Sequence, residues 1–221
     1  MIPSALSAVP VVLSAPSGAG KTSIARALVA REKDFAFSVS ATTRPRRGEE
    51  VHGVDYWFLS REEFLEMIRR GEFVEWAEVH GELYGTPRSS LTEASVGGRH
   101  VILDIDVQGA RQIREAVPEA LLLFILPPSV PALLTRLEAR GTEGDAAIRR
   151  RLETALEELE AADAFDHHIV NDDLERAIEE VRDLVRRGGG VSRNDPVPEK
   201  VLRLRAGIGS ILGRDTISDS T

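Results

Sequence analysis

The sequence contains no cysteine and very little lysine. Without cysteine, neither disulfide bonds nor thiolate metal sites can form. Only three of the 28 basic residues are lysines, namely Lys21, Lys33 and Lys200, so each is a candidate for a special role. No apolar run is long enough to span a membrane, and Met1–Pro10 lacks the basic start and long apolar run of a signal peptide. These absences predict a cytoplasmic protein.

An excess of positive charge is also missing. The net charge is −8 at pH 7, which argues against a general nucleic-acid-binding protein, because such proteins present a basic surface. A phosphorylated ligand would therefore have to meet a local basic cluster. The 221 residues, 42% of them hydrophobic and 29% charged, are typical of one globular domain with an insertion or a tail.

A phosphate-binding loop is predicted between an apolar run, 11–14, and a helical pattern that follows Thr22. Small residues would let backbone N–H groups surround a polyphosphate, and the helix N-terminus would add to the attraction. We expect Lys21 to reach the β- and γ-phosphates and the Thr22 hydroxyl to ligate Mg²⁺. The alternative is a chance glycine-rich turn, since the usual first glycine is replaced by alanine. The predicted ATP-binding residues of the loop are Ala15, Pro16, Ser17, Gly18, Ala19, Gly20, Lys21 and Thr22.

Strand and helix patterns alternate along most of the chain, which predicts an α/β fold with a parallel sheet flanked by helices. Residues 41–97 interrupt the alternation with short strands and short helices and are interpreted as an inserted lobe. Asp172, with Glu175, is expected to cap the last helix of the compact part. Residues 189–221 are predicted to form a flexible tail, because three glycines interrupt the helical spacing of its apolar residues.

An arginine-rich loop follows the second predicted strand and contains Arg44, Arg46 and Arg47. Arginine holds a phosphate through two parallel hydrogen bonds and keeps its charge. Arg44 and Arg47 are therefore candidates for binding a second phosphate, with the hydroxyls of the chain's two tyrosines, Tyr56 and Tyr84, as further donors. The alternative is a solvated basic loop. Which of Arg46 and Arg47 contacts phosphate stays open.

Seven motifs, in order along the chain, resemble guanylate kinase. They are the phosphate-binding loop, Ser38–Arg44, Val51–Tyr56, Phe73–Trp76, Tyr84–Thr86, Ile102–Gly109 and Ile169–Leu174. The resemblance covers about residues 11–187 and implies a P-loop nucleotide kinase fold over residues 1–188. It implies a core (1–40, 98–138 and 156–188), a GMP-binding lobe (41–97) and a mobile lid (139–155).

The resemblance implies phosphoryl transfer from ATP to GMP, with Mg²⁺ as cofactor and dGMP as a further acceptor. No nucleic-acid or membrane partner is expected, and the oligomeric state stays open. The implied catalytic residues are Lys21, Arg44, Arg140 and Arg151. The implied GMP-binding residues are Ser40, Arg44, Arg47, Tyr56, Glu75, Tyr84, Thr86 and Asp106. Asn171 would approach the ATP base, and Thr22 and Asp104 would serve the metal. Which of Arg149, Arg150 and Arg151 contacts phosphate stays open.

The choice of base follows from the atoms on its edge. Guanine presents N1–H and N2–H₂ as donors, and an ionised carboxylate only accepts, so Glu75 can take both. Adenine would leave that carboxylate unpaired, and sites of this kind reject the wrong ligand by roughly 10⁴-fold. The alternative for Glu75 is a surface carboxylate.

Two other functions remain possible for the protein as a whole. One is a non-catalytic guanylate-kinase-like interaction module, against which Lys21 and Thr22 argue. The other is a P-loop kinase that acts on another acceptor.

Overall fold

A parallel five-stranded sheet forms the centre of the protein. The computed structural model describes residues 8–79, 81–139, 145–188 and 198–213. The strand order is β2-β7-β1-β8-β9, and every neighbouring pair is parallel, so all five carboxyl ends lie at one edge, as predicted. The strands are β1 (Pro10–Ser14), β2 (Phe35–Phe37), β7 (His100–Asp104), β8 (Leu121–Leu126) and β9 (His167–Val170).

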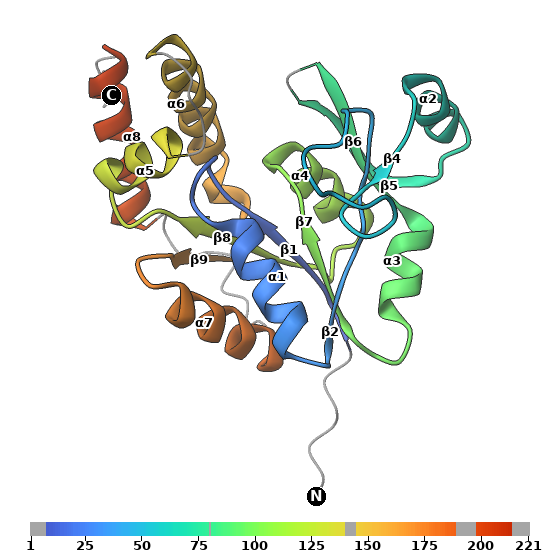
Figure 1. Ribbon diagram of the computed structural model, residues 1–221. Coiled ribbons are helices and arrows are strands. Elements are labelled where there is room, and N and C mark those ends of the chain that lie inside the picture. Colours follow the sequence, from blue (N-terminus) through green and yellow to red (C-terminus); the bar gives the residue numbers. More distant parts are fainter. Residues whose placement is uncertain (1–7, 80, 140–144, 189–197, 214–221) are drawn as a thin grey trace, which may run out of the picture.

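Helices cover both faces of this sheet (Figure 1). On one face, α1 (Lys21–Arg31) and α7 (Leu174–Arg186) pack over one apolar core. The opposite core is covered by α3 (Arg88–Ser95), α4 (Val107–Ala116), α5 (Val130–Glu138), α6 (Asp145–Glu160), a short 3₁₀ helix η1 (Ala162–Ala164) and α8 (Glu199–Leu212). Strand β8 is apolar at every position because its alternate side chains enter these two cores. No helix in the described ranges is long and apolar enough to cross a membrane.

A second sheet forms a separate small lobe, defined here as residues 41–87, beside the carboxyl edge of the central sheet (Figure 1). Its strands, in the order β4-β3-β6-β5, are β3 (Ala41–Thr42), β4 (Trp57–Phe58), β5 (Phe73–Val79) and β6 (Glu82–Pro87). Helix α2 (Arg61–Arg69) begins with a capping box formed by Ser60 and Glu63. The lobe has its own small core, in which the Phe64 and Phe73 rings stack with centroids 4.4 Å apart.

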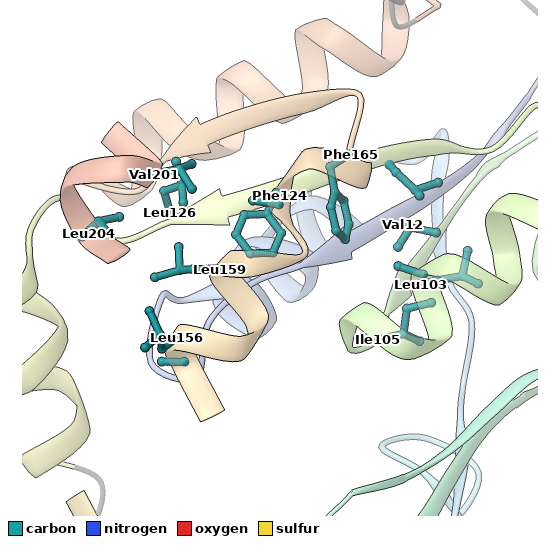
Figure 2. Close-up of a cluster of buried hydrophobic side chains, with 14 of the residues drawn as sticks. Val12, Leu103, Ile105, Phe124, Leu126, Leu156, Leu159, Phe165, Val201 and Leu204 are labelled. Atoms are coloured by element: carbon teal, nitrogen blue, oxygen red, sulfur yellow. The ribbon is translucent and has the colours of Figure 1, made fainter. Parts of the chain in front are cut away.

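The prediction of a flexible tail was wrong for residues 199–212, which form helix α8. Four of its apolar side chains enter the core beside α6, and Figure 2 shows Val201 and Leu204 near Leu126 and Leu159. Glycine disfavours an isolated helix, yet Gly207 lets α8 approach α5: a Cβ at this position would lie 2.9 Å from Val130 Cγ2. Burial of the apolar face therefore outweighs the weak helix propensity of glycine. Residues 189–197 and 214–221 lie outside the described ranges.

One predicted helix cap is displaced by a residue. The carboxylate of Asp173, not that of Asp172, accepts the hydrogen bond from the Arg176 backbone N–H, at 3.0 Å. Asp172 instead accepts from the backbone N–H of Asp173, at 2.8 Å. Two adjacent aspartates both suit an N-cap by residue type, so the sequence alone gave no basis for choosing between them.

Candidate active site

The phosphate loop, residues 15–22, connects β1 to α1. Gly18 and Gly20 have φ angles of 89° and 99°, a region that residues with a Cβ rarely adopt. Gly20 is the N-cap of α1 and offers no side chain to the helix's first N–H groups, so these remain available to an anion. Ala15, at the position that is usually glycine, is buried in the apolar core beside α1.

Three side chains from distant parts of the chain hold this loop from outside. The Ala19 carbonyl accepts hydrogen bonds from Asn171 Nδ2 at 2.7 Å and from Arg136 Nη1 at 3.1 Å. Glu158 Oε2 accepts from the Ser17 backbone N–H at 2.9 Å. Asn171 thus lies against the loop, but its amide is bonded to the loop backbone; its contact with the ATP base stays a prediction. Sequence reasoning missed Arg136 and Glu158, because neither belongs to a recognisable local motif.

Lys21 lies where β1 and β7 end. Its Nζ donates to the Ile105 carbonyl at 2.6 Å and forms an ion pair with Asp104 Oδ1 at 2.7 Å. Burial of the ammonium lowers its pKa, but the charge and hydrogen bond of Asp104, together with the negative charge of Glu158 and the influence of Tyr56, leave the pKa raised. Lys21 is therefore a cation at neutral pH, already placed at the carboxyl edge of the sheet.

A cavity of about 240 Å³ lies between this edge and the small lobe. It brings together two residues of the phosphate loop and five of the eight residues predicted for GMP, although they come from both lobes; Arg44, Arg47 and Thr86 are not part of its lining. Its lining includes Lys21, Thr22, Ser40, Tyr56, Glu75, Tyr84, Asp104 and Asp106. The cavity thus joins the predicted triphosphate site on the core to the predicted monophosphate site on the small lobe.

Glu75, on β5, lines this cavity and is only 4% exposed. Thr86 Oγ1 donates to Glu75 Oε1 at 2.6 Å. Burial raises the pKa of Glu75 to about 7; the Thr86 hydrogen bond opposes this shift and the nearby Asp106 adds to it. A Cβ on Gly109 would lie 2.4 Å from Glu75 Oε2, so the glycine in helix α4 leaves room for this carboxylate.

Asp106 is both a cavity residue and the N-cap of α4. Its Oδ1 accepts from the Gly109 backbone N–H at 2.8 Å, which fixes the direction of the carboxylate. Ser40 is buried at the point where the chain passes from the core into the small lobe. The carboxylates of Glu75 and Asp106 are thus held in place by hydrogen bonds from within the fold.

Arg44 is held by a carboxylate that sequence reasoning missed. Its guanidinium donates to both oxygens of Glu50, at 2.6 Å each, and lies 4.8 Å from the centroid of the Tyr56 ring. The hydrogen bond from Arg44 lowers the pKa of Glu50 to about 2 and raises the pKa of Arg44. Glu50 also accepts from the Arg47 backbone N–H at 2.8 Å. The Arg46 guanidinium lies over the Phe58 ring, and the Arg47 side chain is exposed.

The predicted lid arginines are placed only in part. Arg140 lies outside the described residues. Arg151 Nη1 donates to the Leu137 carbonyl at 2.8 Å, near the end of α5, and Arg151 does not line the cavity. Arg149 Nη2 donates to the Leu212 carbonyl of α8 at 2.8 Å. A role for these arginines in phosphate binding stays a prediction.

This fold and this loop define a P-loop nucleotide kinase. The sequence profile of the guanylate kinase family matches residues 7–188, and the chain belongs to that family. It is 50% identical over 175 residues to a guanylate kinase of Symbiobacterium thermophilum, covering 79% of this chain and 83% of the relative. It is 51% identical over 177 residues to a guanylate kinase of Rubrobacter xylanophilus, covering 80% and 93%.

A solved structure supports the same assignment. The crystal structure of guanylate kinase from Anaplasma phagocytophilum superposes with a TM-score of 0.66 at 36% sequence identity. The match covers 84% of this chain and 88% of the solved chain. The profile match ends at residue 188, so helix α8 lies beyond the part that defines the family.

Proposed function

We propose that this protein transfers the γ-phosphoryl group of ATP to GMP, giving ADP and GDP. The observation that carries the proposal is the buried carboxylate of Glu75, which lines the same cavity as Lys21 and Thr22. One wall thus offers a cation and main-chain donors to phosphates, and the other offers an acceptor to a base. The family match and the named relatives support the same reaction.

The acceptor base is held by Glu75, Thr86, Ser40 and Asp106. The Glu75 carboxylate accepts from the N1–H and N2–H₂ groups of guanine. Thr86 already donates to Glu75 Oε1, which fixes the carboxylate before the base arrives. The Ser40 hydroxyl donates to O6 or N7, whereas the single hydroxyl proton of Thr86 is already given to Glu75. dGMP, which has the same base, is accepted as well.

The acceptor phosphate meets Arg44 and Arg47, with the hydroxyls of Tyr56 and Tyr84. Arg44 is buried and held in place by Glu50, so little side-chain entropy remains to be lost when the phosphate binds. Arg46 stacks on Phe58, which supports Arg47 as the second phosphate ligand.

Transfer needs no strong general base, because the attacking oxygen of GMP is already anionic at neutral pH. Catalysis is then positioning and charge stabilisation. Lys21 leaves Asp104 and follows the transferred group, while Arg44 holds the acceptor. Arg140 and Arg151 approach when the lid closes, and closure excludes water that would otherwise hydrolyse ATP.

The Thr22 hydroxyl and the Asp104 carboxylate fit Mg²⁺, which prefers oxygen ligands. Among the described residues, no group of three or more His, Asp or Glu side chains is placed to hold a metal. This agrees with an ion held by few protein ligands together with nucleotide phosphates and water. When bound, Mg²⁺ neutralises charge on the β- and γ-phosphates. Asp104 also pairs with Lys21, so its carboxylate would become available to the ion once Lys21 moves to the phosphates.

The test is an assay of ADP formation with GMP, dGMP, AMP and UMP as acceptors. We expect rapid turnover with GMP, slower or equal turnover with dGMP, and almost none with AMP or UMP. Lys21→Ala should lower turnover by about a thousandfold while the thermal melt shows a folded protein. Near-normal turnover in that variant would contradict the mechanism. A wild-type protein that binds GMP but forms no ADP would favour a non-catalytic interaction module.

A further inference from the structure

A partly buried contact joins helix α6 to the phosphate loop, between residues 141 positions apart in sequence. Glu158, in the last turns of α6, accepts a hydrogen bond from the Ser17 backbone N–H at 2.9 Å. Glu157 and Glu160, on the same helix, are exposed, whereas Glu158 is partly buried beside the apolar residues Ala155 and Leu159. The carboxylate of Glu158 is thus turned inward by the position of its helix against the core.

The contact fixes the orientation of one peptide unit in the loop. In a planar trans peptide the C=O and the following N–H point in opposite directions. Between Pro16 and Ser17 the N–H points to Glu158, and the Pro16 carbonyl accepts from the Ala19 N–H at 3.0 Å. A side chain that holds the N–H therefore also holds the carbonyl, and with it the first turn of the loop.

The Glu158 carboxylate lies in surroundings that disfavour its charge. Burial raises the pKa of Glu158 to about 7, and the negative charges of Asp106 and Glu157 add to the shift. The Ser17 hydrogen bond and the charge of Lys21 act in the other direction. The folded protein thus retains an ionisable group whose charge it disfavours, at a position where it contacts the nucleotide-binding backbone.

We propose that Glu158 is a positioning residue that holds the phosphate loop, through Ser17, in the conformation that binds ATP. The inference rests on the proposed function, because it assigns ATP to that loop. The loop's remaining N–H groups then meet the phosphates without first being ordered, which strengthens binding of ATP. Helix α6 begins at Asp145, directly after residues 140–144 of the predicted lid, so Glu158 also connects the loop to the helix that carries Arg151.

The test compares Glu158→Ala, Glu158→Gln and Glu160→Ala by titration with ATP in the absence of GMP, followed by steady-state kinetics. For Glu158→Ala we expect the ATP Kd to rise by about tenfold, with the KM for GMP changed less than about twofold. Glu158→Gln keeps an acceptor oxygen and should restore ATP binding to within about threefold of wild type. Glu160→Ala, an exposed control, should match wild type.

Unchanged ATP binding in Glu158→Ala would overturn the inference. So would an equal loss of ATP and GMP binding together with a lower melting temperature, because that pattern is a general loss of structure. If Glu158→Ala does not fold, Glu158→Asp is the second variant. It keeps the charge, but its shorter side chain withdraws the acceptor from Ser17, so it should weaken ATP binding without weakening GMP binding. Failure of the proposed function would be distinct: wild-type protein would bind ATP and yet transfer nothing to GMP.

Discussion

Glu75 shows how a single residue couples base recognition to protonation. Its carboxylate is removed from water, and its pKa is about 7. Only the ionised form offers acceptors to both guanine donors, because the protonated acid carries a donor of its own. We therefore expect the KM for GMP to rise as the pH falls from 8 to 6, while the KM for ATP changes much less. In Glu75→Gln, GMP binding should be weak at every pH, and this pH dependence should disappear.

The same residue should make the folded protein less stable at high pH. Its pKa is raised from 4.5 to about 7, so the unfolded chain loses the proton first and stability falls as the pH rises through this window. The loss should reach up to about 3 kcal/mol above pH 7. Glu75→Gln should accordingly melt at a higher temperature than wild type at pH 8, with the difference vanishing near pH 4. A variant less stable than wild type at pH 8 would refute this account.

At the residue scale, the sequence indicated cavity residues that belong to motifs and missed residues whose role depends on a contact that no motif encodes. Lys21, Glu75 and Tyr84 line one cavity, as their motifs indicated. Glu50 and Glu158 were missed. Glu50 has the ordinary appearance of a charged loop residue, and Glu158 that of one glutamate among several on a helix. Glu50 matters because the fold places it opposite the Arg44 guanidinium. Glu158 matters because the fold places it opposite the Ser17 backbone N–H.

At the scale of elements, helix α8 tests how far packing overrides propensity. Gly207 faces Val130 of α5, and an added Cβ would lie 2.9 Å from Val130 Cγ2. Alanine favours a helix over glycine by about 1 kcal/mol. We nevertheless expect Gly207→Ala to lower the free energy of unfolding by about 1–2 kcal/mol, because the side chains cannot both fit without displacing α8. Denaturant unfolding measures this change.

A matched control on the same helix is Ser210→Ala, since Ser210 is exposed. It should leave stability unchanged or raise it slightly. If Gly207→Ala were also neutral or stabilising, the close packing of α8 on α5 would be refuted.

The central strands were predictable because a strand buried on both faces is apolar at every position. Helix α8 was not, because its two glycines and the glycine that caps it conceal an apolar face that only packing against α5 and α6 explains.

At the scale of the whole molecule, the two substrates are assigned to different lobes. The core carries the phosphate loop, and the small lobe carries Glu75 and Arg44. An ion pair between Arg26 of α1 and Asp55 of the small lobe, at 2.7 Å, joins the two lobes outside the cavity. The proposed reaction requires the phosphate loop and the small lobe to face each other across the cavity, so that the two nucleotides meet head to head. The cytoplasmic location stays a prediction.

The most direct measurement is a crystal structure of the protein with GMP bound. We predict that the guanine N1–H and N2–H₂ groups lie within hydrogen-bond distance of the Glu75 carboxylate, and that the phosphate lies against Arg44. GMP bound outside the cavity, or with its guanine edge turned away from Glu75, would contradict the account.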